Sequence, residues 1–157
     1  MEHDIVLGTE SWLCTDIFEN EIFPDSHNIF YRNDRCKSRG GGVFALISRD
    51  IKSEVIFHSN DFKEKISDSE SIWIKLKSNA GTIVLAVVYN PSGKLDFIDD
   101  ITTIAKMIRG NNANLPLNGS EEIIMGGDFN LNSIYHISWH DNQIIGDNIS
   151  AIVFSFH

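Results

Sequence analysis

The chain has 157 residues, of which 42% are hydrophobic and 22% are charged. This length and composition suit one packed domain and argue against intrinsic disorder. The formal net charge of −9 disfavours tight nucleic-acid binding, because neutralising phosphates drives most of that affinity. No apolar run approaches the ~20 residues that a membrane helix needs, and the start, Met-Glu-His-Asp, lacks the basic segment of a signal peptide. We therefore expect one globular domain without membrane partners.

The first ninety residues contain a series of short apolar segments bounded by polar ones. Ile5–Thr9 predicts a buried strand, followed after Trp12 by a short helical or irregular segment. Thr82–Val88 is a near-continuous run of β-branched and aliphatic residues, which is typical of a strand buried on both faces. The other apolar segments are Asn28–Arg32, Val43–Ser48 after a triple glycine, Val55–Phe57 as an edge strand, and Ser71–Leu76.

The hydrophobic period then changes. Between Leu95 and Ile108 apolar residues recur at three- and four-residue spacing with charged residues opposite, which predicts one amphipathic helix. We expect Gly110 and the Asn-rich stretch after it to close this helix. Glu122–Met125 predicts a last short buried strand, broken sharply by the glycines that follow. Many strands with one helix packed on a sheet predict an α+β sandwich, while the apolar tail from 149 to 156 has no clear period.

Three places along the chain could carry chemistry. Glu10 is an acid at the carboxyl end of a strand, where layered folds gather ligands and metals, although a helix-start carboxylate would look the same. Tyr89 ends a buried strand and is held by a following proline, but it could equally be an aromatic cap. Asp128 and Asn130 project from one tight loop after a glycine, and an ordinary Asx turn would also use this pattern.

The order of these segments resembles a known family. The segments are Thr-Glu-Ser-Trp-Leu at 9–13, Asp-Arg at 34–35 before Arg-Gly-Gly-Gly-Val at 39–43, Val-Val-Tyr-Asn-Pro at 87–91, and Ile-Ile-Met-Gly-Gly-Asp-Phe-Asn-Leu at 123–131. The set resembles the endonuclease/exonuclease/phosphatase superfamily, which includes DNase I-like nucleases. It is most similar to the endonuclease of non-LTR retrotransposons, and the resemblance covers about residues 5 to 139.

The resemblance implies a role for each candidate residue. Glu10 would be the ligand of a divalent metal, for which Mg²⁺ suits carboxylate and water oxygens and Mn²⁺ is a substitute. Tyr89 would donate a hydrogen bond to the scissile phosphate, and Asp128 would orient or deprotonate the attacking water. Asn130 would hold the phosphate or the nucleophile. The implied substrate is DNA, in an intracellular protein with access to the nucleus, and Cys14 and Cys36 are expected to be reduced thiols.

The sequence also departs from the family pattern. Neither the Asn of the family's first strand nor its terminal Ser-Asp-His motif has a match here. We therefore expect residues 1–157 to be a single partial domain with an incomplete DNase I-like fold and weak or undetectable nicking activity. Alternatives are a catalytically dead or partner-binding remnant, and a phosphatase of the same superfamily.

Two further groups of residues have more than one interpretation. His136 and His140 lie four apart near Asp141 and could suggest a zinc pair, although we favour surface positions for them. Four basic residues lie close together and form either a basic stripe for a nucleic acid or a solvated loop. These are Arg32, Arg35, Lys37 and Arg39.

Overall fold

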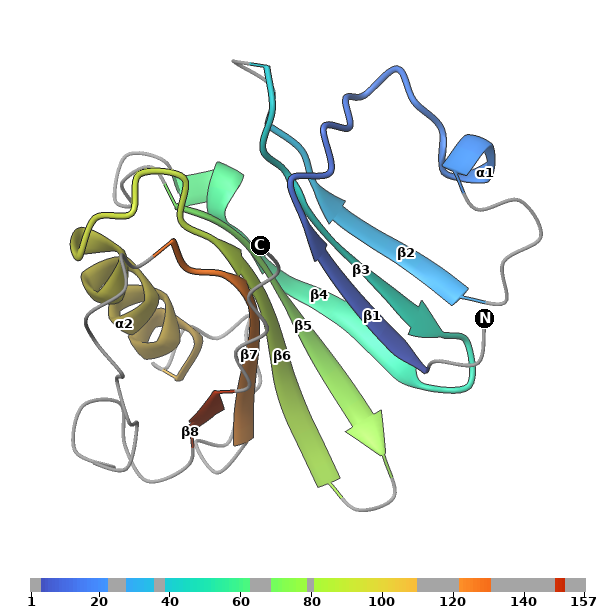
Figure 1. Ribbon diagram of the computed structural model, residues 1–157. Helices are drawn as coiled ribbons and strands as arrows, with labels where there is room; N and C mark the ends of the chain where they lie inside the picture. Colours follow the sequence, from blue (N-terminus) through green and yellow to red (C-terminus); the bar gives the residue numbers. More distant parts are fainter. Residues whose placement is uncertain are drawn as a thin grey trace.

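The chain folds into a mixed α+β structure with two β-sheets (Figure 1). The computed structural model describes residues 4–22, 28–35, 39–62, 69–78, 81–109, 122–130 and 149–151. The smaller sheet lies against one face of the larger sheet, and the long helix α2 covers the other face (Figure 1). The predicted α+β class with two sheets is therefore confirmed. Within the described residues, no helix is both long and apolar enough to cross a membrane.

The smaller sheet has three antiparallel strands in the order β1-β3-β2. They are β1 (Ile5–Thr9), β2 (Asn28–Asn33) and β3 (Val43–Ser48), and the short helix α1 (Glu19–Ile22) lies between β1 and β2 in sequence. The central strand β3 is the most apolar, and its alternate residues Val43, Ala45 and Ile47 are fully buried. This alternation places one apolar face of the sheet against the larger sheet.

The larger sheet has the order β4-β5-β6-β7-β8. Its strands are β4 (Lys52–His58), β5 (Glu70–Ser78), β6 (Gly81–Tyr89), β7 (Glu122–Asp128) and β8 (Ile149–Ala151), with a 3₁₀ turn, η1 (Ser59–Phe62), after β4. The first three strands form an antiparallel meander, whereas β6, β7 and β8 run parallel. Parallel neighbours need a crossover, and the helix α2 (Asp96–Arg109) provides it between β6 and β7. β4 is at an edge, as predicted.

The hydrophobic core consists of two layers, one on each face of the larger sheet. Between the sheets, Ile72, Ile74, Leu85 and Val87 pack against the buried face of β3. On the other face, Trp73, Val84, Ala86 and Val88 pack against Ile101, Ile104 and Ile108 of α2. Because neighbouring residues of β5 and β6 point to opposite faces, both strands are buried on two sides. The prediction for Thr82–Val88 is confirmed.

Strand β7 differs from its prediction. We expected the strand to end at Met125, but it continues through Gly126 and Gly127 to Asp128, so that prediction was wrong. The two glycines pair in parallel with Val87 and Val88. A Cβ at Gly127 would overlap the backbone carbonyl of Val88, and the φ of Gly127 is +145°. The glycines therefore allow close pairing with β6 and do not interrupt the strand.

Other boundaries also shift. β4 begins at Lys52, earlier than predicted, and β5 continues to Ser78. The tail forms the short strand β8 at Ile149–Ala151, to which the sequence assigned no structure. Gly110, which we expected to close α2, lies outside the described residues.

Candidate functional site

The ends of β1, β6 and β7 meet at one end of the interface between the two sheets. Tyr89 is the last residue of β6 and Asp128 is the last of β7, and they are register partners in the parallel pair. The same register pairs Leu85 with Ile124, whose side chains pack between the sheets. Because side chains alternate along a strand, Tyr89 and Asp128 also lie on the side of the larger sheet that faces β1.

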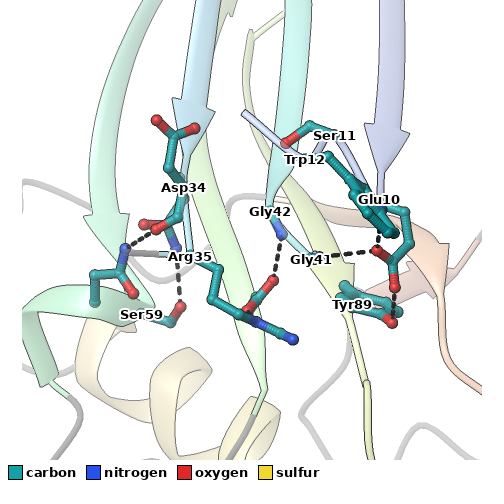
Figure 2. A network of polar contacts seen from close by, with 12 residues as sticks. Glu10, Ser11, Trp12, Asp34, Arg35, Gly41, Gly42, Ser59 and Tyr89 are labelled. Carbon is teal, nitrogen blue, oxygen red and sulfur yellow. Dashed lines mark hydrogen bonds and ion pairs between the residues drawn. The ribbon is translucent and has the colours of Figure 1, made fainter. Parts of the chain in front are cut away.

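Glu10 follows β1 and reaches Tyr89 from the smaller sheet. The Tyr89 hydroxyl donates a hydrogen bond to Glu10 Oε1. Two further donors point at Glu10 Oε2, namely the Gly41 backbone N–H and the Trp12 indole N–H, each at 2.8 Å. Figure 2 shows Glu10 and Tyr89 directed toward one another with Gly41 and Trp12 beside the carboxylate. The carboxylate is thus fixed in place although the residue is exposed.

The backbone around Glu10 has an unusual conformation. Glu10 and Trp12 have φ values of +53° and +56°, in the left-handed region that such residues rarely adopt. Opposite them, Gly40, Gly41 and Gly42 have φ values of +86°, +76° and +88°. The two segments are joined by backbone hydrogen bonds, from Trp12 N–H to the Gly41 carbonyl at 2.9 Å and from Ser11 N–H to the Gly42 carbonyl at 3.3 Å. Strained residues of this kind cluster at functional sites.

The hydrogen bonds shift the pKa values of both partners. Burial acts to raise the pKa of Glu10, but the hydrogen bonds from Tyr89, Gly41 and Trp12 and the charge of Arg35 outweigh it, so the pKa lies below its ordinary value. Burial raises the pKa of Tyr89 well above its ordinary value, and the hydrogen bond to Glu10 and the negative charges of Glu10 and Asp128 add to this effect. Tyr89 is therefore a proton donor to hydrogen bonds at any physiological pH.

We predict that Tyr89→Phe raises the pKa of Glu10, because the variant removes a donor to the ionised carboxylate. In the wild type the folded pKa is lowered, so ionised Glu10 stabilises the fold above the unfolded-state pKa. That stability is lost as the pH falls through the lowered folded pKa. An NMR titration of the Glu10 carboxyl carbon would measure the shift.

Tyr31→Phe is the matched control, because the Tyr31 hydroxyl bonds to Ser53 and not to Glu10. This variant should leave the titration of Glu10 unchanged. Equal titration curves for Glu10 in the wild type and in Tyr89→Phe would mean that the hydrogen bond is not formed in solution.

Asp128 and Asn130 form a turn that is tied to the end of β6. The Asn130 N–H donates to Asp128 Oδ1 at 3.0 Å, and the Asn130 side-chain amide donates to the Asn90 carbonyl at 3.1 Å. In return, the Asn90 side chain donates to the Phe129 carbonyl at 3.0 Å, and Phe129 packs edge-to-face on Phe97. The structure thus brings Asn130 beside Asn90, and its described contacts are those of the Asx turn that the sequence also allowed.

Arg35 and Glu70 form a partly buried ion pair at the site, a pairing that the sequence did not predict. The Arg35 side chain pairs with Glu70 Oε1, and the Gly42 N–H donates to Glu70 Oε2 at 2.6 Å. The Arg35 guanidinium also lies over the Tyr89 ring, 5.9 Å from its centroid. Burial acts to lower the pKa of Arg35, but the hydrogen bond and the charge of Glu70 raise it overall. The Asp-Arg and triple-glycine segments of the resemblance were the sequence signal for this pair.

The described basic residues form neither a continuous stripe nor a simple solvated loop. Arg32 pairs with Asp34 at 3.2 Å and donates to the Ile17 carbonyl at 2.8 Å. Arg35 is held by Glu70, as described above. Arg39 lies over the Trp12 ring, 5.7 Å from its centroid. Lys37 lies outside the described residues.

The donors at the site suit a hard divalent cation. Glu10 and Asp128 offer carboxylate oxygens, which Mg²⁺ prefers, and this ion commonly takes only one or two carboxylates together with water. Within the part of the chain that the structure describes, no group of three His, Cys, Asp or Glu residues could hold a metal ion. Glu10 and Asp128 thus offer two carboxylates and do not form a closed cage. His136, His140 and Asp141 lie outside the described residues, and Cys14 is an exposed free thiol.

Comparisons of this chain with protein-family models, with curated proteins and with solved structures found no match. Its function therefore has to be inferred from its own residues and their contacts.

Proposed function

We propose that this protein belongs with the DNase I-like endonucleases, nearest those of non-LTR retrotransposons, and hydrolyses phosphodiester bonds in DNA with a divalent metal ion. The observation that carries this proposal is the meeting of Glu10, Tyr89 and Asp128 at the ends of three strands. Glu10 and Asp128 are 128 − 10 = 118 positions apart in sequence. Two sheets with a helix packed on the outer face also fit the two-sheet sandwich with flanking helices that the resemblance implies.

The residues divide the chemistry between them. A bound divalent ion would neutralise charge on the phosphate, and Glu10, with Asp128 nearby, would hold it. Tyr89 has one O–H and donates it to Glu10 in the structure. If Glu10 held a cation, the Tyr89 O–H would be available to donate to a phosphate oxygen. Burial raises the pKa of Tyr89 above its ordinary value, so the hydroxyl stays protonated for this role, while Asp128 would accept a hydrogen bond from the attacking water and orient it.

We predict slow nicking of supercoiled plasmid DNA with Mg²⁺ or Mn²⁺, because neither the Asn of the family's first strand nor its terminal Ser-Asp-His motif has a match in the sequence. Asp128→Ala should reduce the rate by a further ~10²-fold or more, as expected for removal of one preorganised group. The measurement is a nicking time course at high protein concentration, with EDTA as the metal-free reaction.

Glu122→Ala is the matched control, because Glu122 is an exposed carboxylate at the opposite end of the same strand. Nicking should be unchanged in this variant. Metal-dependent nicking that survives Asp128→Ala would reject the site assignment. No nicking by the wild type under any of these conditions would reject the enzymatic proposal and favour the catalytically dead remnant.

A further inference from the structure

Trp12 is exposed and yet held rigidly beside Glu10. Its side chain is 57% exposed, so burial contributes little to keeping it in place. Three contacts fix it instead: the backbone bond to Gly41, the indole N–H bond to Glu10, and Arg39 over the ring. Its left-handed backbone conformation is a further cost. Single exposed hydrophobic residues are ordinary. One that is fixed in this way next to a candidate metal-binding carboxylate is a candidate for binding a ligand.

We propose that the Trp12 indole is a stacking platform for an unpaired nucleobase next to the phosphodiester held at Glu10, with Arg39 contacting a flanking phosphate. This inference rests on the proposed function, because it places the phosphodiester at Glu10. The indole bonds directly to that carboxylate, so its ring lies within about one nucleotide of a phosphate bound there. A base stacked on an aromatic ring must expose its face, which selects a single strand or an unpaired nucleotide.

The charge distribution favours stacking over phosphate binding as the source of affinity. The chain has a net charge of −9, and Arg32 and Arg35 are paired with Asp34 and Glu70. Arg39 is the arginine placed beside the exposed ring. One phosphate contact on a single strand gives a salt slope of about −0.7. Binding should therefore weaken only about 2- to 3-fold between 50 and 200 mM salt.

Binding is measured with Mg²⁺, because the cation is what would hold the phosphodiester at Glu10, and within a time too short for the slow cleavage predicted above. The probes are a labelled oligo(dT) and a chain of the same length made of abasic deoxyribose phosphates, which has the same charge but no bases. Anisotropy under these conditions gives the affinity for each. Trp12→Ala should weaken oligo(dT) binding on the order of 5- to 100-fold, the usual effect of losing one stacked base. Binding of the abasic chain should change less than about 2-fold.

Further variants test the Trp12 ring separately from its hydrogen bond to Glu10 and from the charge of Arg39. Trp12→Phe keeps an aromatic face but loses the N–H to Glu10, so it should retain most of the oligo(dT) affinity. Arg39→Ala should weaken the binding of both probes, because both carry phosphates, and that of oligo(dT) more, because Arg39 also lies over the Trp12 ring. Phe18→Ala is the matched control, since Phe18 is also an exposed aromatic, at 67%. It should bind both probes like the wild type.

Three results would overturn the platform: no binding of oligo(dT) by the wild type, equal weakening of both probes by Trp12→Ala, or no weakening of oligo(dT) binding by Trp12→Ala. The second result would mean that Trp12 acts by holding Glu10. Circular dichroism checks that Trp12→Ala is folded. If Trp12→Ala is unfolded, Trp12→Phe still tests the ring. A wild type that binds through Trp12 but never nicks DNA would reject the proposed function alone. Nicking with no effect of Trp12→Ala on oligo(dT) binding would reject the platform alone.

Discussion

Gly127→Ala is expected to lower the free energy of unfolding by roughly 4 kcal/mol, a large part of the stability of a typical domain. The added methyl group would overlap the backbone carbonyl of Val88, which cannot move aside as a flexible side chain could. Alanine at φ +145° adds backbone strain of about 1–3 kcal/mol, and overpacking a tight interior adds about 1–3 kcal/mol. Urea denaturation followed by circular dichroism would measure the change.

Gly81→Ala separates the two contributions. Gly81 has a similar φ of +141°, but a Cβ there would meet no atom within 4 Å. This variant should therefore show the backbone strain alone, and the difference between the two variants gives the cost of the overlap with Val88. Equal losses at the two positions would show that β7 does not pair closely with β6 at this point.

Glu70→Ala is expected to destabilise the protein by about 2–4 kcal/mol. Removing one partner of a fully buried ion pair costs about 3–5 kcal/mol, and the Arg35 side chain is 21% exposed. Glu70 is 6% exposed, and its two oxygens accept hydrogen bonds from Arg35 and the Gly42 N–H. The variant leaves both donors without this acceptor, in a part of the protein that is shielded from water. Denaturant unfolding would again be the measurement.

A surface pair supplies the control for this prediction. Glu54 and Lys77 lie 3.5 Å apart with side chains 53% and 49% exposed. Glu54→Ala should cost less than about 1 kcal/mol, because water screens an exposed pair. In the double variant Arg35→Met with Glu70→Leu, no charge is left buried, so it should be more stable than Glu70→Ala. A Glu70→Ala protein as stable as Glu54→Ala would mean that water enters the Arg35 pair.

Strands and helices were predictable wherever the pattern of apolar residues along the sequence was strong. The unbroken apolar run of β6 and the helical period of α2 each fix an element without knowledge of its neighbours. β7 was predicted too short because glycine is read as a breaker when the sequence is considered alone. Here Gly127 is required by the nearness of Val88, which is 39 positions away in sequence (127 − 88 = 39). No local pattern can reveal such a requirement.

The same limit applies to the site. The sequence singled out Glu10, Tyr89 and Asp128 through a resemblance, and the structure places the three strand ends together. The sequence alone could not show that Tyr89 donates a hydrogen bond to Glu10, because that contact joins two different sheets. The pairing of Arg35 with Glu70 was missed for a related reason. A charged residue is usually exposed, and burial of this pair depends on a partner 35 positions away.

The left-handed residues next to β1 also bear on how this sequence can change over time. Glycine or asparagine would suit the backbone at Glu10 and Trp12 better than the residues present, because both adopt positive φ at little cost. Selection for stability alone would therefore replace them. Replacement of Glu10 would remove the carboxylate to which Tyr89 and Gly41 donate hydrogen bonds. A more stable descendant of this protein is thus one route by which the candidate site would be lost.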